Sequence, residues 1–207
     1  MPSFLTPDWN APIDTEAHIR AIPAGSIIKG MYPAAIAAEA KKRGMKLAHA
    51  GEKYLPFLDY PMTDHTRLLV EGARAFFPEL PMRQALRKIG RAAVGVFMQS
   101  TLGKAMLGGL TQPETTLRAL TGMTRAYTTS LGKPTPHVEV REIDETACIV
   151  RLSDFWLFID CHQVGILEGV CRACGVKGEM RVAMEAPSRG EIECRWEPTP
   201  QSRPSGF

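Results

Sequence analysis

The sequence predicts an α+β fold, in which an N-terminal helical half is followed by a C-terminal half with two β-hairpins flanking one long helix. Three observations lead to this prediction. Apolar residues recur at spacings of three and four up to about residue 131, which is typical of helices packed on a core. Two pairs of β-branched or alternating segments follow, within 137–153 and 179–198. Between them lies FWLFIDCHQVGILEGVCRAC (155–174), which we expect to be helical.

The helical half is expected to contain five helices, at 15–21, 27–43, 64–77, 82–103 and 114–131. Asp64 or its neighbour Thr63 is expected to cap the third helix, because a short polar side chain can accept a hydrogen bond from the first turn. Thr111 and Glu114 fit a capping box before the fifth helix. The aromatic residues of the segment 44–62 predict a loop that packs against the domain.

Arg83, Arg87 and Arg91 form a stripe along one face of the predicted helix 82–103. A charged stripe usually faces solvent, so we expect a solvated surface here, with a partner-binding or anion-binding site as the alternative. The formal net charge of the chain is only +3. This small bias does not predict binding to nucleic acid.

The 207-residue length predicts a single domain at about 15–197, with an N-terminal tail at 1–14 and a C-terminal tail at 198–207. No apolar run approaches the roughly 18 residues of a membrane span. The first residues lack the basic and apolar regions of a secretory signal, which favours a cytoplasmic location.

The five cysteines make a poor disulfide framework, because their number is odd and three lie within 161–174. Cys171 and Cys174 form a Cys-x-x-Cys pair, but without a second pair we expect two buried, reduced thiols. The sequence contains no GxSxG, HExxH, phosphate-binding GxxxxGK[ST] or dinucleotide-binding GxGxxG motif. These absences disfavour hydrolase, protease, nucleotidase and dehydrogenase functions.

The chain resembles an expanded paralogous family of small proteins of unknown function from the Myxococcales. Five matching segments carry the resemblance, which spans about 27–183: IKGM (28–31), FLDYP (57–61), MRQALRKIG (82–90), RAY (125–127) and DCHQVGILEGVCRACGV (160–176).

This architecture is in turn similar to a haem-nitric-oxide/oxygen-binding domain, through IKGMYPAAIAAEAKKRG and the glycine-bearing QVGILEG. The resemblance implies a sensor fold with an iron-binding histidine before the first hairpin, at the position of Thr124. No histidine occurs in 111–136, and the propionate-binding Tyr-x-Ser-x-Arg motif is absent from 153–157. Haem held by histidine is therefore not expected. Tyrosine can also hold haem iron, and Tyr127 is one turn away, but a tyrosine on an apolar helix face is more often a core residue.

A second resemblance is to 4-vinyl-reductase-like small-molecule-binding domains. It implies a metal site on the long helix and the last hairpin, where Cys161, Glu185 and Cys194 match the ligand positions. Ser188 stands where a further cysteine ligand should be. Because structural zinc takes four donors, the remaining three residues make a zinc site improbable.

From these features we expect a non-enzymatic, cytoplasmic sensor or signalling domain with a pocket for a small apolar molecule between the long C-terminal helix and the N-terminal helices. The candidate lining residues are Tyr127, Trp156, Phe158, Cys161, His162, Gly165 and Gly169. One alternative is a ligand-free module for homodimerisation or for binding a signalling partner. Another is a vinyl-reductase-like enzyme accessory, with Cys161 and His162 as acid and base.

Overall fold

The fold is α+β, as the sequence predicts, with helices first and an antiparallel sheet with a long helix in the C-terminal half. A computed structural model describes residues 3–99, 103–105 and 108–198. The elements are α1 (Thr15–Ala21), β1 (Ile27–Lys29), α2 (Met31–Lys42), β2 (Asp59–Pro61), α3 (Met62–Phe76), α4 (Met82–Gln99), η1 (Pro113–Thr115), α6 (Thr116–Ser130), β3 (His137–Asp144), β4 (Ala147–Ser153), η2 (Ile159–Gln163), α7 (Val164–Ala173), β5 (Val176–Ala186) and β6 (Arg189–Pro198).

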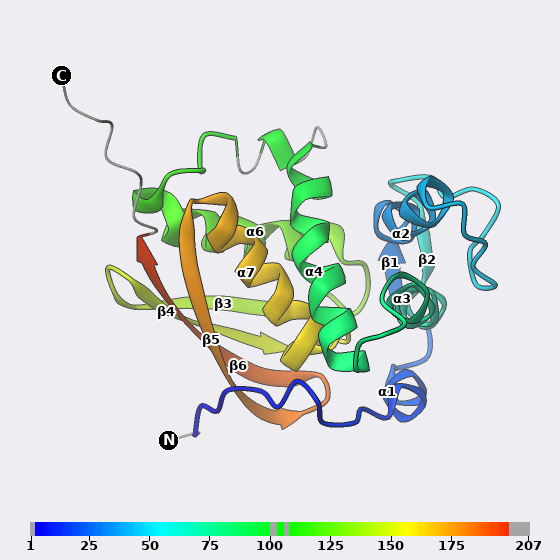
Figure 1. The fold of residues 1–207 in the computed structure, drawn as a ribbon, viewed down its shortest axis with the longest axis horizontal. Coiled ribbons are helices and arrows are strands. Elements are labelled where there is room, and N and C mark those ends of the chain that lie inside the picture. Colours follow the sequence, from blue (N-terminus) through cyan, green and yellow to red (C-terminus); the bar gives the residue numbers. More distant parts are fainter. Residues whose placement is uncertain (1–2, 100–102, 106–107, 199–207) are drawn as a thin grey trace.

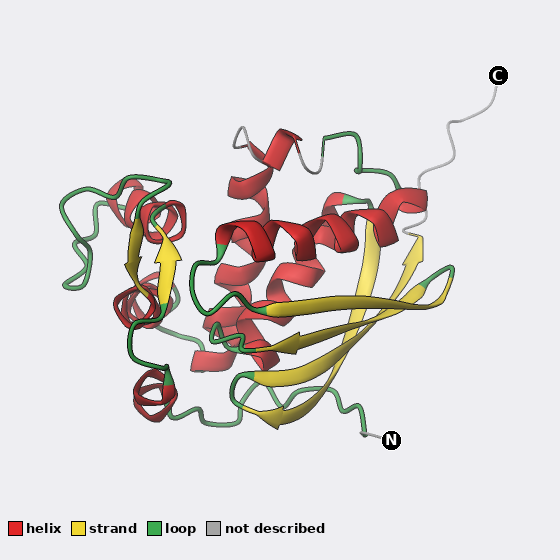
Figure 2. Cartoon of the chain, turned by 180° about the vertical axis from the view of Figure 1, so that it is seen from behind, coloured by secondary structure: helices red, strands yellow, loops and turns green. Residues whose placement is uncertain are grey.

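The two predicted hairpins join into one antiparallel sheet with the strand order β3-β4-β6-β5. The join is the β4–β6 pairing, which runs from Ala147 opposite Arg195 to Leu152 opposite Gly190. Helices α6 and α7 cover one face of this sheet, α4 packs on α7, and α3 and α2 follow on the far side of α4 (Figures 1 and 2). Helix α4 therefore stands between the sheet half and the N-terminal helices.

The structure has two hydrophobic cores, one in the sheet half and one among the N-terminal helices. The larger core joins the inner face of the sheet to α6 and α7, with Leu152, Leu167 and Ile192 fully buried. The smaller core joins α2, α3 and α4, and it also takes in Phe158 and Cys161 from the C-terminal half. Apolar burial is the main favourable term in folding, so each half has its own stabilising core.

The expected helix at 27–43 begins later than predicted, because Ile27–Lys29 forms strand β1 and pairs with β2. The helix α2 starts only at Met31. Gly30, between β1 and α2, is closely packed against the following loop, because a Cβ atom there would overlap the carbonyl oxygen of Leu55. The β-branched side chains of Ile27 and Ile28 suit a strand.

The helix caps differ from the predicted ones. Helix α3 begins at Met62 without a side-chain cap, and Asp64 instead forms an ion pair of 3.3 Å with Arg67. At the start of η1, the reciprocal capping box uses Gln112 and Thr115, one position later than predicted.

The arginine stripe of α4 is not a solvated surface, which corrects the sequence-based expectation. Arg83 pairs with Asp160 of η2, while Arg87 and Arg91 both bind Glu168 of α7. The Arg91 Nη2–Glu168 Oε2 distance is 2.5 Å, and only 10% of the Glu168 side chain is exposed. The acidic partners lie 77–81 residues further along the chain, so local charge patterning could not reveal them.

Residues 3–14 contact the rest of the domain, whereas the sequence predicts a tail at 1–14. The backbone of Leu5 pairs with Val182 of strand β5 through two hydrogen bonds of 3.0 and 2.8 Å. Further along, the ring of Trp9 lies under the guanidinium of Arg87, 4.0 Å from ring centroid to Cζ. The N-terminal segment is thus attached both to the sheet and to α4. Residues 199–207 lie outside the described residues.

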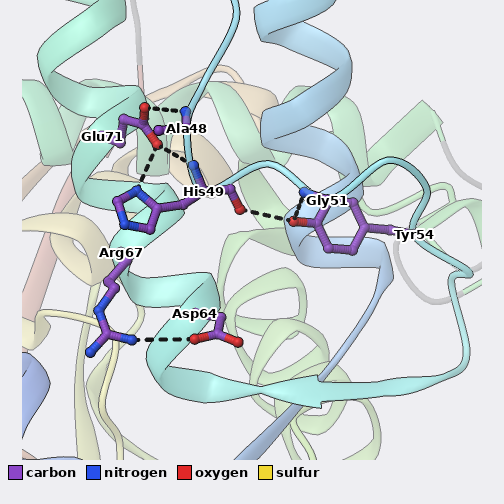
Figure 3. A network of polar contacts seen from close by, with 7 residues as sticks. All are labelled: Ala48, His49, Gly51, Tyr54, Asp64, Arg67 and Glu71. Atoms are coloured by element: carbon purple, nitrogen blue, oxygen red, sulfur yellow. Dashed lines mark hydrogen bonds and ion pairs between the residues drawn. The ribbon is translucent and has the colours of Figure 1, made fainter.

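The loop between α2 and β2 is anchored to α3 (Figure 3). The Glu71 carboxylate accepts hydrogen bonds from the backbone N–H groups of Ala48 and His49, at 2.5 and 2.9 Å, and it contacts His49 Nδ1 at 2.9 Å. These contacts lower the pKa of Glu71 against the opposing effect of its desolvation. The same loop carries Phe57 just before β2, and 79% of this residue is exposed.

Candidate functional site

A cavity of about 170 Å³ lies where the two halves of the molecule meet. Helices α2, α3, α4, α6 and α7, the turn η2 and Leu157 just before η2 supply its walls. Apart from two histidines, its described lining consists of Met31, Tyr32, Ala35, Ile36, Leu69, Ile89, Ala93, Val94, Val96, Phe97, Met123, Leu157 and Ile166. The lining is thus almost entirely apolar, which is typical of small-molecule pockets.

The members of this wall that carry polar side-chain atoms are His65 of α3, His162 of η2 and Tyr32 of α2, through its hydroxyl. Burial lowers the pKa of His162 to about 4, against a small opposing effect of the Leu157 carbonyl. Burial also lowers the pKa of His65 to about 3, with a further contribution from the charge of nearby His162. Both imidazoles are therefore neutral at neutral pH. The Nδ1 atom of each has no hydrogen-bond partner among the described residues.

The backbone around His162 departs from a regular helix. The segment Ile159–Gln163 is a π-helical turn, and Phe158 before it adopts a left-handed conformation with φ of 47°. A bulky residue with positive φ is strained, and π-helical turns recur at functional sites. Here the turn directs the side chain of His162 towards the N-terminal helices.

The predicted lining residues Gly165 and Gly169 contact helix α4. A Cβ atom on Gly165 would overlap the carbonyl oxygen of Arg87, and one on Gly169 would lie 2.7 Å from Val94 Cγ2. Across the interface, a Cβ atom on Gly90 would overlap the carbonyl oxygen of His162. The two helices therefore meet backbone to backbone. Helix α4 therefore occupies the space beside these two glycines, where a pocket was predicted.

Trp156 and Phe158 lie in a cluster beside α1. His18 Nε2 lies 3.0 Å from the carbonyl oxygen of Trp156, and its ring stacks on Phe158 with centroids 4.1 Å apart. Leu157, between them in sequence, contributes to the cavity wall instead. Of the residues predicted to line a pocket, the described structure places His162 at this cavity.

Cys161 is buried in the smaller core, and this burial raises the pKa of its thiol well above the usual value. The possible zinc ligands are not brought together. Cys194 lies in the sheet core, with its Sγ atom 3.8 Å from that of Cys171, and Glu185 is exposed. Among the described residues, no group of three or more histidine, cysteine or acidic side chains is placed to hold a metal ion.

Sequence reasoning missed His65. The adjacent Asp64 was predicted to cap the helix, and no function was predicted for His65. The available signal was periodicity, because His65, Leu69, Gly72 and Phe76 recur at three or four residues on the buried face of α3. The side chain of Tyr127 lies outside the described residues, so its proximity to the cavity stays a prediction.

A comparison with known protein families shows which family the chain belongs to. Residues 22–197 match the family described as "Protein of unknown function (DUF2378)". The chain belongs to this family. No curated protein matches the sequence. Among its described residues, this DUF2378 chain has no helix that combines the length and the apolar character of a membrane span.

The fold of this DUF2378 chain is similar to that of H-NOX proteins. The unliganded Fe(II) H-NOX protein from K. algicida aligns with a TM-score of 0.61 and 11% identity, covering 84% of this chain and 99% of that one. The H-NOX domain from Shewanella oneidensis in the Fe(II)CO state gives 0.60 and 10%, covering 82% and 99%. At these identities the likeness shows the fold alone.

The residues of this DUF2378 chain do not fit a haem bound as the resemblance implies. Position 124, where that resemblance places the iron-binding histidine, is a threonine whose side chain lies outside the described residues. The cavity is close in volume to the ~150 Å³ sites that hold one benzene, whereas haem is a macrocycle of four pyrrole rings. No arginine or lysine occurs among its described lining residues to pair with the propionates.

Proposed function

We propose that this chain is a non-enzymatic sensor or signalling domain that binds a small apolar molecule in the cavity. The observation that carries the proposal is an almost wholly apolar cavity of about 170 Å³ at the junction of the two halves. Its walls come from α2 and α3 on one side and from α6 and α7 on the other, with α4 between. A bound molecule would therefore contact both halves, which is the property that a ligand-controlled signalling domain requires.

The expected result for the native protein is saturable binding of benzene, detected as a rise of the melting temperature and as shifts of methyl NMR signals. At a concentration ten times its dissociation constant, a ligand stabilises the native state by about 1.4 kcal/mol. For a domain of this size, that corresponds to a melting-temperature increase of about 3 to 6 °C.

The variant Ala35→Phe is expected to abolish benzene binding, because Ala35 lines the cavity and a phenyl ring would fill it. The matched control is Ala38→Phe, on the exposed side of the same helix, which should bind benzene like the native protein. Unchanged binding in a folded Ala35→Phe protein would show that benzene sits elsewhere. No binding to the native protein would contradict the proposed function.

One observation favours the alternative of an interaction module. Leu55, Phe57 and Leu58 form an exposed apolar patch in the turn just before β2, with 44%, 79% and 54% of each residue exposed. If the chain forms a homodimer through this patch, light scattering should show a dimer that Phe57→Ser converts into a monomer. A native protein that stays monomeric at high concentration would exclude this homodimer.

A further inference from the structure

A second hollow in the molecule is a groove between the end of α3, the C-terminal part of α4 and the last turns of α7. Its volume is about 510 Å³, and Val94 is the one described residue that also lines the apolar cavity. The side chains of Phe77, Val94 and Met98 make its floor apolar, together with small glycine and alanine residues. Pockets for small molecules span roughly 300–1,000 Å³ and are mainly apolar, so this groove has the size of such a site.

The charged residues of the groove are all basic. Lys88 and Arg91 of α4 and Arg172 of α7 line it, and no acidic side chain does so among its described residues. Lys88 and Arg172 are exposed, and neither forms an ion pair within the described part of the chain. Arg91 shares the single carboxylate of Glu168 with Arg87, so positive charge is in excess there as well. The groove therefore complements a negative charge.

The positive charge lies directly beside the apolar floor. The Lys88 ammonium is 5.1 Å from the centroid of the Phe77 ring. A ligand that fits both features has an apolar part, which is removed from water on the floor, and an anionic group, which accepts charge-assisted hydrogen bonds from lysine or arginine. A carboxylate is such a group, because its two oxygens also match the planar fork of an arginine.

We propose that the groove binds a small amphiphilic acid, a carboxylate on an apolar chain, and that the charges of Lys88 and Arg172 stabilise the carboxylate. This site is separate from the apolar cavity and does not depend on the function proposed for that cavity.

The test uses octanoate, with octan-1-ol and octylamine as compounds that share its chain length and differ in charge. Each is titrated by NMR into the full native chain at low ionic strength. Octanoate should bind most tightly, and added salt should weaken its binding, because exposed charges are screened. Octan-1-ol that binds as tightly as octanoate would overturn the proposal, since charge would then play no part.

The double variant Lys88→Gln, Arg172→Gln is expected to raise the dissociation constant of octanoate about tenfold, which corresponds to about 1.4 kcal/mol. The matched control is Lys53→Gln, Arg141→Gln, which removes the same two charge types from exposed positions outside the groove. This control should leave the dissociation constant unchanged. Equal weakening by both double variants would mean that octanoate responds only to the net charge of the protein.

A variant that fills the groove tests the apolar half of the proposal. A Cβ atom on Gly95, which lines the groove, would have no heavy atom within 4 Å. Leucine also favours helix over glycine, so Gly95→Leu should fold and should abolish octanoate binding. Circular dichroism verifies the fold, and undiminished binding of octanoate to a folded Gly95→Leu protein would contradict the proposal.

The position of bound octanoate separates this groove from the apolar cavity. Backbone amide NMR signals of Ala92 and Gly95 should shift on titration, and Ala35→Phe, which fills the cavity, should leave octanoate binding unchanged. Loss of octanoate binding in the Ala35→Phe protein would place the acid in the cavity and overturn the proposal. An acidic peptide, acetyl-Glu-Leu-Glu-Leu-amide, that binds where octanoate does not would overturn it in favour of a protein partner.

Discussion

Gly165→Ala is expected to lower the free energy of unfolding by about 3 kcal/mol, near the upper end of the usual range for overpacking. The added methyl group would overlap the backbone carbonyl oxygen of Arg87. A backbone atom within a helix cannot rotate away as a flexible side chain can, so α4 and α7 would have to separate. That separation would also stretch the ion pairs of Arg87 and Arg91 with Glu168.

The matched control for this variant is Gly95→Ala, in helix α4 but with no heavy atom within 4 Å of the added Cβ. Because alanine favours helix over glycine, Gly95→Ala should be neutral or stabilising by roughly 0.5–1 kcal/mol. Urea unfolding of the two variants and the native protein measures both effects. Equal stability of the Gly165→Ala and Gly95→Ala proteins would refute a backbone-to-backbone contact between α4 and α7.

Acidification is expected to destabilise the protein strongly. The folded-state pKa values of His65 and His162 are about 3 and about 4, below the ordinary value of 6.5 that they regain on unfolding. Between pH 6.5 and about 4 the unfolded state therefore binds more protons, so stability is complete above pH 6.5 and falls as the pH decreases. At 1.36 kcal/mol per pKa unit, the loss from pH 8 to pH 4 is on the order of 5 kcal/mol.

Urea unfolding at pH 8, 6, 5 and 4 measures this loss. Carboxylates also begin to titrate near pH 4, so the comparison needs the double variant His65→Leu, His162→Leu. The double variant should lose much less stability than the native protein between pH 6.5 and 4.5. Parallel pH profiles for the two proteins would mean that the histidines are hydrated or charged in the native state.

The parts of the fold that follow from local patterns were predictable from the sequence. The hairpins β3–β4 and β5–β6 and the helices α1, α3 and α6 lie close to their expected places, because β-branched runs, helical spacing, prolines and glycines act within a few residues. Gly165 and Gly169 of α7 were predicted to line a pocket, whereas α4 fills the space beside them. They could not identify the approaching element, since Gly165 itself gives no information about Arg87.

The features that depend on distant residues were not predictable in this way. Nothing local to Arg87 reveals that its partner is Glu168, and nothing local to His65 places it beside His162. The strand at Ile27–Lys29 was missed for a related reason, since a three-residue strand has no period of its own. The cavity is assembled from five α-helices, the turn η2 and the segment before it, so its composition appears only once the chain is folded.

The pairing of Leu5 with Val182 has a consequence for the behaviour of the molecule in solution. Strand β5 is an edge of the sheet, and an uncovered edge presents backbone groups that can pair with another chain and seed aggregation. The N-terminal segment covers part of that edge, and Trp9 stacked against Arg87 holds the segment in place. The segment that the sequence suggests is a tail thus occupies backbone groups of Val182 that a second chain could otherwise pair with.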